Sequence, residues 1–175
     1  NLIIPENINF TIDAGVNLKL INSASILSYS SINLNGKADD IITVTTNPDS
    51  RSSVIIVYTD NVSIIQHTNF KNLSYPSSMG SLITGSVTFY EANVNINNCK
   101  FINNLLTDDN LNIVRSQFTI SNSQFINSLS DAIDIDFSSG SLDNLSIRNS
   151  GNDGLDFSNS IVNGNNLYIN GSLDK

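Results

Sequence analysis

Apolar and polar residues alternate along most of the chain with the two-residue period of a β-strand. The pattern is clearest in three copies of a short motif, at residues 109–113, 131–135 and 153–157, which recur at equal intervals. Each copy opens with an aspartate and then places apolar side chains two positions apart, as Ile133 and Ile135 do in the second. A regular repeat of roughly 22 residues indicates a solenoid, in which each coil buries its apolar face against neighbouring coils.

Three sets of apolar residues recur at matching positions of successive coils. They are Phe70, Phe101, Phe125, Ile147 and Ile169; Val87, Leu111, Ile133 and Leu155; and Phe89, Ile113, Ile135 and Phe157. The first set advances in nearly equal steps except for a longer one from Phe70 to Phe101, which predicts an insertion at residues 75–80. Because parallel strands stack about 4.8 Å apart, each set predicts a continuous buried column.

We expect one domain over residues 1–175, with N-terminal coils at 1–60 and more regular coils at 61–175. Strand-like alternation fills residues 1–35, and the polar segment 46–53 around Pro48 predicts an exposed loop. The chain begins in strand-like sequence and stops partway through an open coil. We therefore expect either part of a larger parent chain or an end-to-end homo-oligomer that extends into filaments.

The net charge of −8 leaves no basic patch, which argues against nucleic acid and against an anionic membrane surface as partners. The sequence contains no apolar stretch long enough to cross a bilayer, so we expect no membrane insertion, and we find no signal peptide. Cys99 is the one cysteine and cannot form an intrachain disulfide.

Four asparagines lie two residues after members of the first apolar set. They are Asn72, Asn103, Asn127 and Asn149, and Gly171 holds the next position. Asparagine tolerates the left-handed backbone conformation, and stacked amides can bond to one another. We predict a structural asparagine ladder at a turn, with a polar binding stripe as the alternative.

Acidic residues recur in two positions of the repeat. Asp109, Asp131 and Asp153 precede the strands and are expected to cap turns, or to form a calcium column, because stacked carboxylates repel without a cation or proton. Two further columns are predicted to face outward, namely Thr88, Asn112, Asp134 and Asp156, and Tyr90, Val114, Asp136 and Ser158. The small residues Ala132 and Gly154 would let a ligand approach the backbone.

This arrangement predicts a sugar- or Ca²⁺-binding surface, with a merely solvated acidic face as the alternative. The candidate ligand-binding residues are Tyr90, Asn112, Asp134, Asp136 and Asp156. The candidate metal ligands are Asp131, Asp134, Asp153 and Asp156.

Repeats of the form Asn-x-x-Phe-x-Asn followed by Asp-Ala-Ile-Asp-Ile resemble those of the pectin-lyase-like superfamily, above all bacterial β-helix repeat proteins. Residues 4–16 are similar to the first coil of that family. The resemblance implies an all-β, single-stranded right-handed parallel β-helix with coils of roughly 22–24 residues, and an extracellular or cell-surface location. This architecture hosts lyases, hydrolases, adhesins and spacers, so it does not fix the activity.

Two segments are similar to motifs of polygalacturonases, which share that fold. Residues 152–156 resemble their Asn-Thr-Asp-Gly-x-Asp motif and residues 107–109 their Asp-Asp pair, but the order is reversed and the Gly-His-Gly and Arg-x-Lys segments are missing. Arg115 and Arg148 are the candidate bases for a lyase, and His67 is expected to be a structural or surface residue and not a general base.

We therefore expect a non-catalytic module with a structural or adhesive role. No catalytic residue is assigned, Ca²⁺ is the one cofactor considered, and a polysaccharide is the candidate partner. A polysaccharide-degrading hydrolase or lyase and a self-assembling filament subunit are the alternatives.

Overall fold

A computed structural model describes residues 1–77 and 83–174. These residues form seventeen strands: β1 (Leu2–Ile4), β2 (Phe10–Asp13), β3 (Asn17–Leu20), β4 (Ile26–Ser28), β5 (Ile32–Asn35), β6 (Ile42–Thr46), β7 (Val54–Gln66), β8 (Thr68–Lys71), β9 (Gly85–Asn97), β10 (Lys100–Asn104), β11 (Asp109–Val114), β12 (Gln117–Ser121), β13 (Gln124–Ser128), β14 (Ile133–Asp136), β15 (Ser139–Ser150), β16 (Leu155–Ser158) and β17 (Ile161–Asn170). Among the described residues there is no α-helix, and so none that could cross a membrane.

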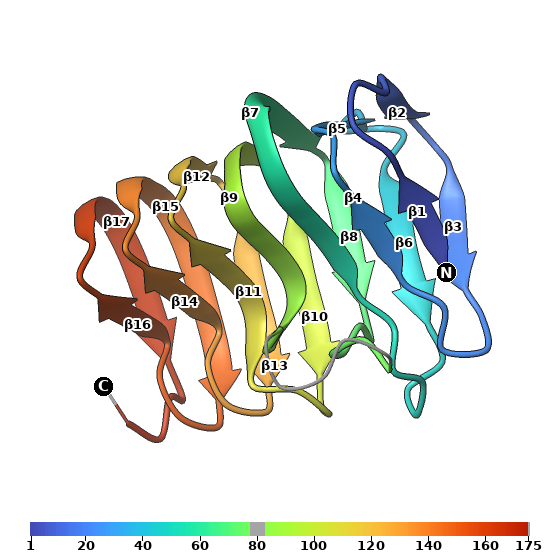
Figure 1. The fold of residues 1–175 in the computed structure, drawn as a ribbon. Coiled ribbons are helices and arrows are strands. Elements are labelled where there is room, and N and C mark those ends of the chain that lie inside the picture. The colour runs from blue at the N-terminus through green and yellow to red at the C-terminus, as the bar shows by residue number, and fades with distance from the viewer. Residues whose placement is uncertain (78–82, 175) are drawn as a thin grey trace.

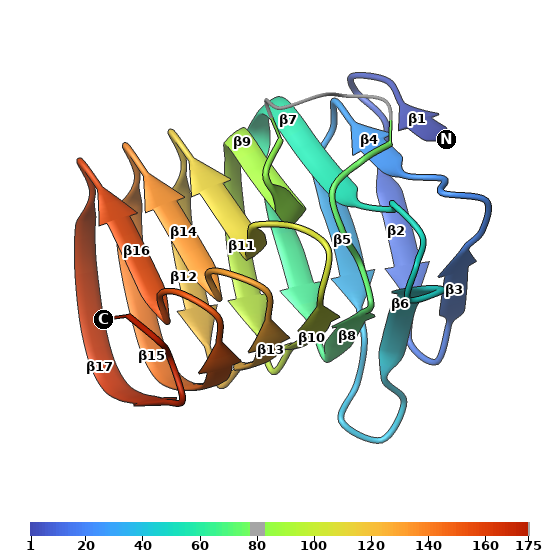
Figure 2. The ribbon, with the colours of Figure 1, turned by 90° about the horizontal axis from the view of Figure 1, so that it is seen from below.

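The strands pair in parallel and wind into a solenoid of about seven coils, which confirms the all-β parallel β-helix class (Figures 1 and 2). Each coil contributes to three faces. The first face contains β1, β4, the start of β7 and of β9, β11, β14 and β16. The second contains β2, β5, the ends of β7 and β9, β12 and the starts of β15 and β17. The third contains β3, β6, β8, β10, β13 and the ends of β15 and β17.

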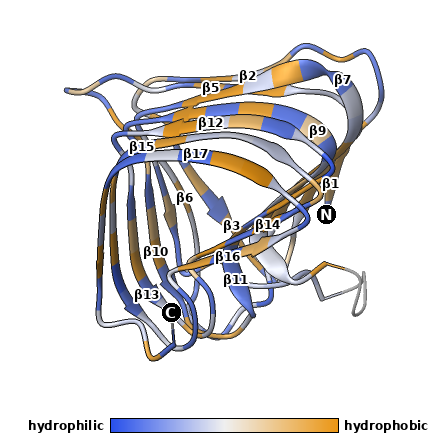
Figure 3. Cartoon of the chain, turned by 90° about the vertical axis from the view of Figure 1, so that its left-hand side faces the viewer, coloured by the Kyte–Doolittle hydropathy of each residue, from blue (hydrophilic) through white to orange (hydrophobic). Residues whose placement is uncertain are grey.

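The strand register confirms all three predicted apolar columns, but two of them are not buried throughout, since Phe157 and Ile169 are each 43% exposed. Phe101 pairs with both Phe70 and Phe125, and their rings stack with centroids 5.0 Å and 4.6 Å apart. Ile133 pairs with Leu111 on one side and Leu155 on the other. Seen along the solenoid axis, the three faces enclose this apolar interior (Figure 3).

The chain turns three times per coil, and we name the turns after the faces they join. The first corner joins the first face to the second, the second corner joins the second to the third, and the third corner follows the third face. The ladder of Asn72, Asn103, Asn127 and Asn149 lies at the third corner, where each residue has φ near +59°. Each amide nitrogen donates to the Oδ1 of the preceding asparagine, as Asn127 does to Asn103 over 2.9 Å.

A second asparagine ladder, which the sequence analysis missed, lies at the second corner. Asn144 donates to Asn122 over 2.8 Å and Asn166 donates to Asn144 over 2.9 Å, and all three have positive φ. The two ladders satisfy polar groups along the stack without placing charges above one another.

Within the long step between Phe70 and Phe101, Leu73 packs into the core and the N–H of Ser74 donates to the Ser52 carbonyl over 2.8 Å, in the turn that enters the first face. Leu73, Ser74 and Pro76 are buried, and so is the outward-directed Ile55 of β7. Of the insertion predicted at residues 75–80, residues 78–80 lie outside the described part of the chain. Further along the same step, Thr84 hydrogen-bonds Asp109 and so brings this segment against the acidic residues.

Candidate functional site

The predicted acidic residues gather on the first face and at the turn that enters it. Asn112 pairs with Asp134 and Asp134 with Asp156 in the register of β11, β14 and β16, while Asp136 pairs with Val114. Asp134, Asp136 and Asp156 are half-buried. We call Asp108, Asp109, Asp131 and Asp134, together with Asn112, the acidic cluster.

Asn112 lies in the outward column as predicted, between the core residues Leu111 and Ile113, but the prediction that its side chain is accessible was wrong. Its side chain is only 5% exposed, and Thr88 in the same column is only 2% exposed. The Nδ2 group of Asn112 donates to Oδ2 of Asp134 over 2.7 Å and to Oδ2 of Asp109 over 3.3 Å. Asn112 therefore bridges the carboxylates of Asp109 and Asp134.

The small residues Ala132 and Gly154 do not open the backbone to a ligand either. Ala132 is buried in the core, and a Cβ added to Gly154 would lie 2.7 Å from the side chain of Ile169. Both positions are small because they point into the solenoid, where neighbouring side chains leave no room.

Asp109 is almost completely enclosed, with 2% of its surface exposed. Its Oδ2 accepts a hydrogen bond from the Thr84 hydroxyl over 2.7 Å, and Thr84 comes from the segment just before β9. Burial raises the pKa of Asp109 to about 7, the Thr84 hydrogen bond opposes this, and the charges of Asp108 and Asp131 add to it.

Asp134 behaves in the same way one coil further on. Burial raises its pKa to about 7, and the negative charges of Asp109, Asp136 and Asp156 raise it further. Two neighbouring carboxyls on one sheet face thus change protonation near neutral pH, which distinguishes this face from an ordinary solvated acidic surface.

Asp131 caps the turn of the next coil. Its Oδ1 accepts the backbone N–H of Asp153 over 2.8 Å and the side-chain amide of Asn152 over 2.9 Å. Partial burial and the charge of Asp131 raise the pKa of Asp153. The carboxylate thus stabilises the backbone entering β16.

Three carboxylates come close enough to share one cation. One oxygen each from Asp108, Asp109 and Asp131 can be chosen so that all three lie within 4.8 Å of one another. Among the described residues this is the acidic group that could hold an ion, and it does not contain Asp134, Asp153 or Asp156. Asp108 was missed as a candidate ligand, although the Asp-Asp pair at 108–109 was visible in the sequence.

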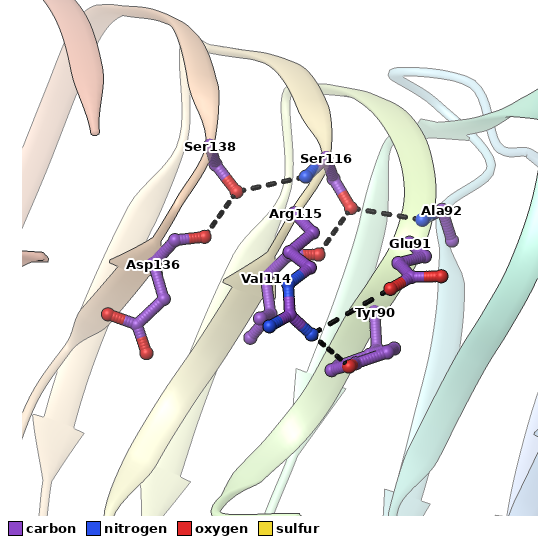
Figure 4. Close-up of polar contacts among 8 residues, drawn as sticks. All are labelled: Tyr90, Glu91, Ala92, Val114, Arg115, Ser116, Asp136 and Ser138. Carbon is purple, nitrogen blue, oxygen red and sulfur yellow. Dashed lines mark hydrogen bonds and ion pairs between the residues drawn. The ribbon is translucent and has the colours of Figure 1, made fainter. Parts of the chain in front are cut away.

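The two candidate bases lie elsewhere. Arg115 lies at the first corner, and its Nη1 is 3.8 Å from Oε1 of Glu91. The same nitrogen donates a hydrogen bond to the Tyr90 hydroxyl (Figure 4). Arg148 hydrogen-bonds Ser146 on the third face and lies over the Tyr168 ring. Neither arginine therefore accompanies the acidic cluster.

Serine hydroxyls hold the first corner together, a feature that the sequence analysis also missed. The Ser116 hydroxyl accepts the N–H of Ala92 over 3.0 Å and donates to the Val114 carbonyl, and Ser138 repeats this contact with Ser116 and Asp136 one coil later (Figure 4). Serines at positions 116, 138 and 160, which share the spacing of the repeat, were the signal for this ladder.

Comparison with known proteins found no family model, curated protein or solved structure that matches this chain. The candidate site therefore rests on its own geometry.

Proposed function

We propose that the protein is a non-catalytic, extracellular or cell-surface β-helix module with a structural or adhesive role, and that its acidic cluster binds Ca²⁺. The observation that carries the proposal is the close approach of the Asp108, Asp109 and Asp131 carboxylates, two of them buried, on a face where neither Arg115 nor Arg148 lies. Buried carboxylates at this separation repel unless a proton or a cation lies between them.

The donor set suits calcium. Ca²⁺ binds six to eight oxygens at about 2.3–2.6 Å, so oxygens that share one ion lie up to about 5 Å apart. The hydrogen bonds of the cluster use Oδ2 of Asp109 and Oδ1 of Asp131, so each carboxylate has a second oxygen for an ion. When bound, the ion would supply positive charge between adjacent coils.

Calcium titration followed by thermal melting tests this proposal. Near neutral pH, calcium at about 100 times its Kd should stabilise the wild type by about 2.7 kcal/mol. Asp109→Asn/Asp131→Asn should abolish the gain, and Asp49→Asn, in the exposed turn before β7, should retain it. A wild-type melting temperature that does not change on adding calcium would contradict calcium binding. The protein would then be interpreted as a structural spacer.

Kinship with the pectin-lyase-like superfamily is part of the same proposal and is supported by the repeat sequence.

A polysaccharide hydrolase is the second candidate, favoured by the Asp109–Asn112–Asp134 arrangement, in which two carboxyls have pKa values of about 7. An inverting glycosidase needs an acid and a base about 6.5–9.5 Å apart with a water between them, whereas here the Asn112 amide bridges the two. Release of reducing ends from polysaccharides would favour this second candidate.

A glycan bound on Asp134, Asp136 and Asp156, and the end-to-end assembly of copies, remain predictions. Glycan binding by Asp134→Asn/Asp156→Asn, compared with the wild type, tests the first. This variant removes two half-buried carboxylates and leaves Asp108, Asp109 and Asp131 in place.

A further inference from the structure

The first corner departs from the residue choice that the chain makes at its other two corners. In five consecutive coils, each corner contains one residue with positive φ. The second corner uses His67, Asn98, Asn122, Asn144 and Asn166, and the third uses Asn72, Asn103, Asn127, Asn149 and Gly171. Asparagine and glycine, which adopt this conformation with least strain, thus fill nine of these ten positions.

The first corner uses Tyr58, Glu91, Arg115, Phe137 and Asn159 in the same backbone conformation. Only Asn159 is a residue that favours positive φ, and a bulky aromatic residue there is a marked outlier. Backbone conformation therefore does not explain the choice of Tyr58 and Phe137. Strained positions of this kind are often retained for what their side chains contact.

Four side chains at or beside this corner form a continuous row, the corner row, made of the exposed Tyr58, Arg115 and Phe137 and the half-buried Tyr90, which precedes Glu91. The rings of Tyr58 and Tyr90 meet edge to face with centroids 5.5 Å apart. The Arg115 guanidinium lies 5.7 Å from the Tyr90 centroid and 5.6 Å from that of Phe137. Tyr58 is 60% exposed and Phe137 is 55% exposed, so two flat apolar rings face solvent across four coils.

Two grooves lie near the row, and Tyr58 lines the first of them. A groove of about 510 Å³ lies at its N-terminal end and is lined by Tyr29 and Tyr58 together with Asn7, Asn9 and Asn61. A groove of about 470 Å³ runs along the second face. Its lining is mixed, with the apolar Val62, Phe118 and Ile161 beside the amides and hydroxyls of Asn93, Asn95, Gln117, Thr119 and Ser141. Rings that can stack are thus flanked by amides and hydroxyls that can hydrogen-bond.

We propose that the corner row and its two flanking grooves bind a neutral polysaccharide, with pyranose rings stacked on Tyr58 and Phe137. This inference rests on the proposed adhesive function and deepens it by naming a ligand class and a surface separate from the acidic cluster. The apolar faces of sugar rings suit exposed aromatic rings, and sugar hydroxyls suit the amides of the grooves.

The charges at the corner select against other partners. Arg115 is paired with Glu91, so the row offers no unpaired cation to phosphate, and Glu6 and Asp60 in the first groove repel an anionic chain. A protein partner would favour a compact apolar patch, whereas these rings form a line one residue wide along the axis.

Affinity electrophoresis and calorimetry with a soluble β-glucan, xylan, mannan and α-glucan test the inference on the whole chain. The wild type should bind at least one of these polymers, and Tyr58→Asn/Phe137→Asn should weaken binding at least about ten-fold, a loss of about 1.4 kcal/mol. His67→Asn is the matched control, since it introduces asparagine at the equivalent position of the second corner and should bind like the wild type. The row variant should melt no lower than the wild type, because asparagine suits positive φ better.

Binding of none of the neutral polymers, equal binding by the row variant, or preference for polygalacturonate or a single-stranded oligonucleotide would overturn the inference. Failure of the proposed function gives different results in the same samples. Reducing ends released from a polymer would contradict the non-catalytic role. A melting temperature insensitive to calcium would contradict calcium binding by the acidic cluster. Neither result changes the comparison of polysaccharide binding between the row variant and His67→Asn.

Discussion

Strands β11 and β16 contain the same repeat motif and lie two coils apart on the first face, yet their side chains have different environments. In β11, Asp109 through Ile113 are all buried, so both sides of the strand are enclosed. In β16, Leu155 and Asp156 are half-buried and Phe157 and Ser158 are exposed. The motif thus determines which residues share a column, but not how far each column is exposed.

The neighbours of each strand explain the difference. β11 pairs with β9 on one side and β14 on the other, and Thr84 hydrogen-bonds over its outer surface. β16 pairs with β14, and no comparable contact covers its outer side within the described residues. The same aspartate or asparagine is therefore enclosed in one coil and close to solvent in another.

The largest effect should follow from placing a charge in the interior column of the middle coils. Ile133 has no exposed surface and lies between Leu111 and Leu155, so Ile133→Asp should lower the free energy of unfolding by about 5 kcal/mol or more. Phe157→Asp, at a position 43% exposed, should cost about 1–2 kcal/mol. Urea unfolding followed by circular dichroism measures both, and equal losses would contradict the contrast between the strands.

The next effect concerns pH. Burial raises the folded-state pKa of Asp109 from 3.8 to about 7, so the folded chain binds more protons than the unfolded chain between these values. The contribution of Asp109 to the free energy of unfolding should therefore be greatest below about pH 4. It should fall by on the order of 2–4 kcal/mol as the pH rises to about 7.

Asp109→Asn tests this because an amide cannot ionise, and it should remove at least half of the fall in stability. Asp156→Asn in β16 should retain most of it, because Asp109 remains in its enclosed position. Melting temperatures measured across this pH range without calcium give the result. A wild-type protein whose stability rises over the range would contradict the assignment.

The columns of the first face were predictable because they depend on spacing alone. Equal intervals along the sequence place Leu111, Ile133 and Leu155 in register, and the structure has that register. The burial of Asn112 was not predictable in the same way. It depends on Thr84, in an earlier segment that interrupts the repeat and carries no periodic signal.

The corners also differ in how far the sequence predicts them. Asparagines at fixed intervals reveal a turn with positive φ, so the ladder through Asn103 and Asn127 was visible in the sequence. Tyr58, Arg115 and Phe137 have the same positive φ, but these residue types do not favour it, so the sequence does not indicate a turn at this corner. The serines that follow Arg115 and Phe137 offered the available signal, since Ser116 and Ser138 are separated by the interval of the repeat.

A smaller effect should follow from removing one hydrogen bond over β11. Thr84→Val deletes the hydroxyl that donates to Asp109 Oδ2 and should cost about 1–2 kcal/mol near pH 8, where the acceptor is charged. Ser158→Ala, at an exposed position of β16, should change stability by less than about 0.5 kcal/mol. Denaturant midpoints compare the two, and a Thr84→Val protein as stable as wild type would show that Thr84 contributes little to enclosing Asp109.

The smallest effects should arise at the corner residues that follow β14 and β16, where Phe137 and Asn159 share one backbone conformation. Phe137→Asn relieves a strained aromatic position but loses the contact with Arg115, so it should raise the free energy of unfolding by about 0.5 kcal/mol. The reciprocal Asn159→Phe should lower it by about 0.5–1 kcal/mol. Paired urea titrations resolve the two signs. If Phe137→Asn instead costs more than about 1 kcal/mol, the ring stabilises the corner, and its exposure would no longer indicate selection for a ligand.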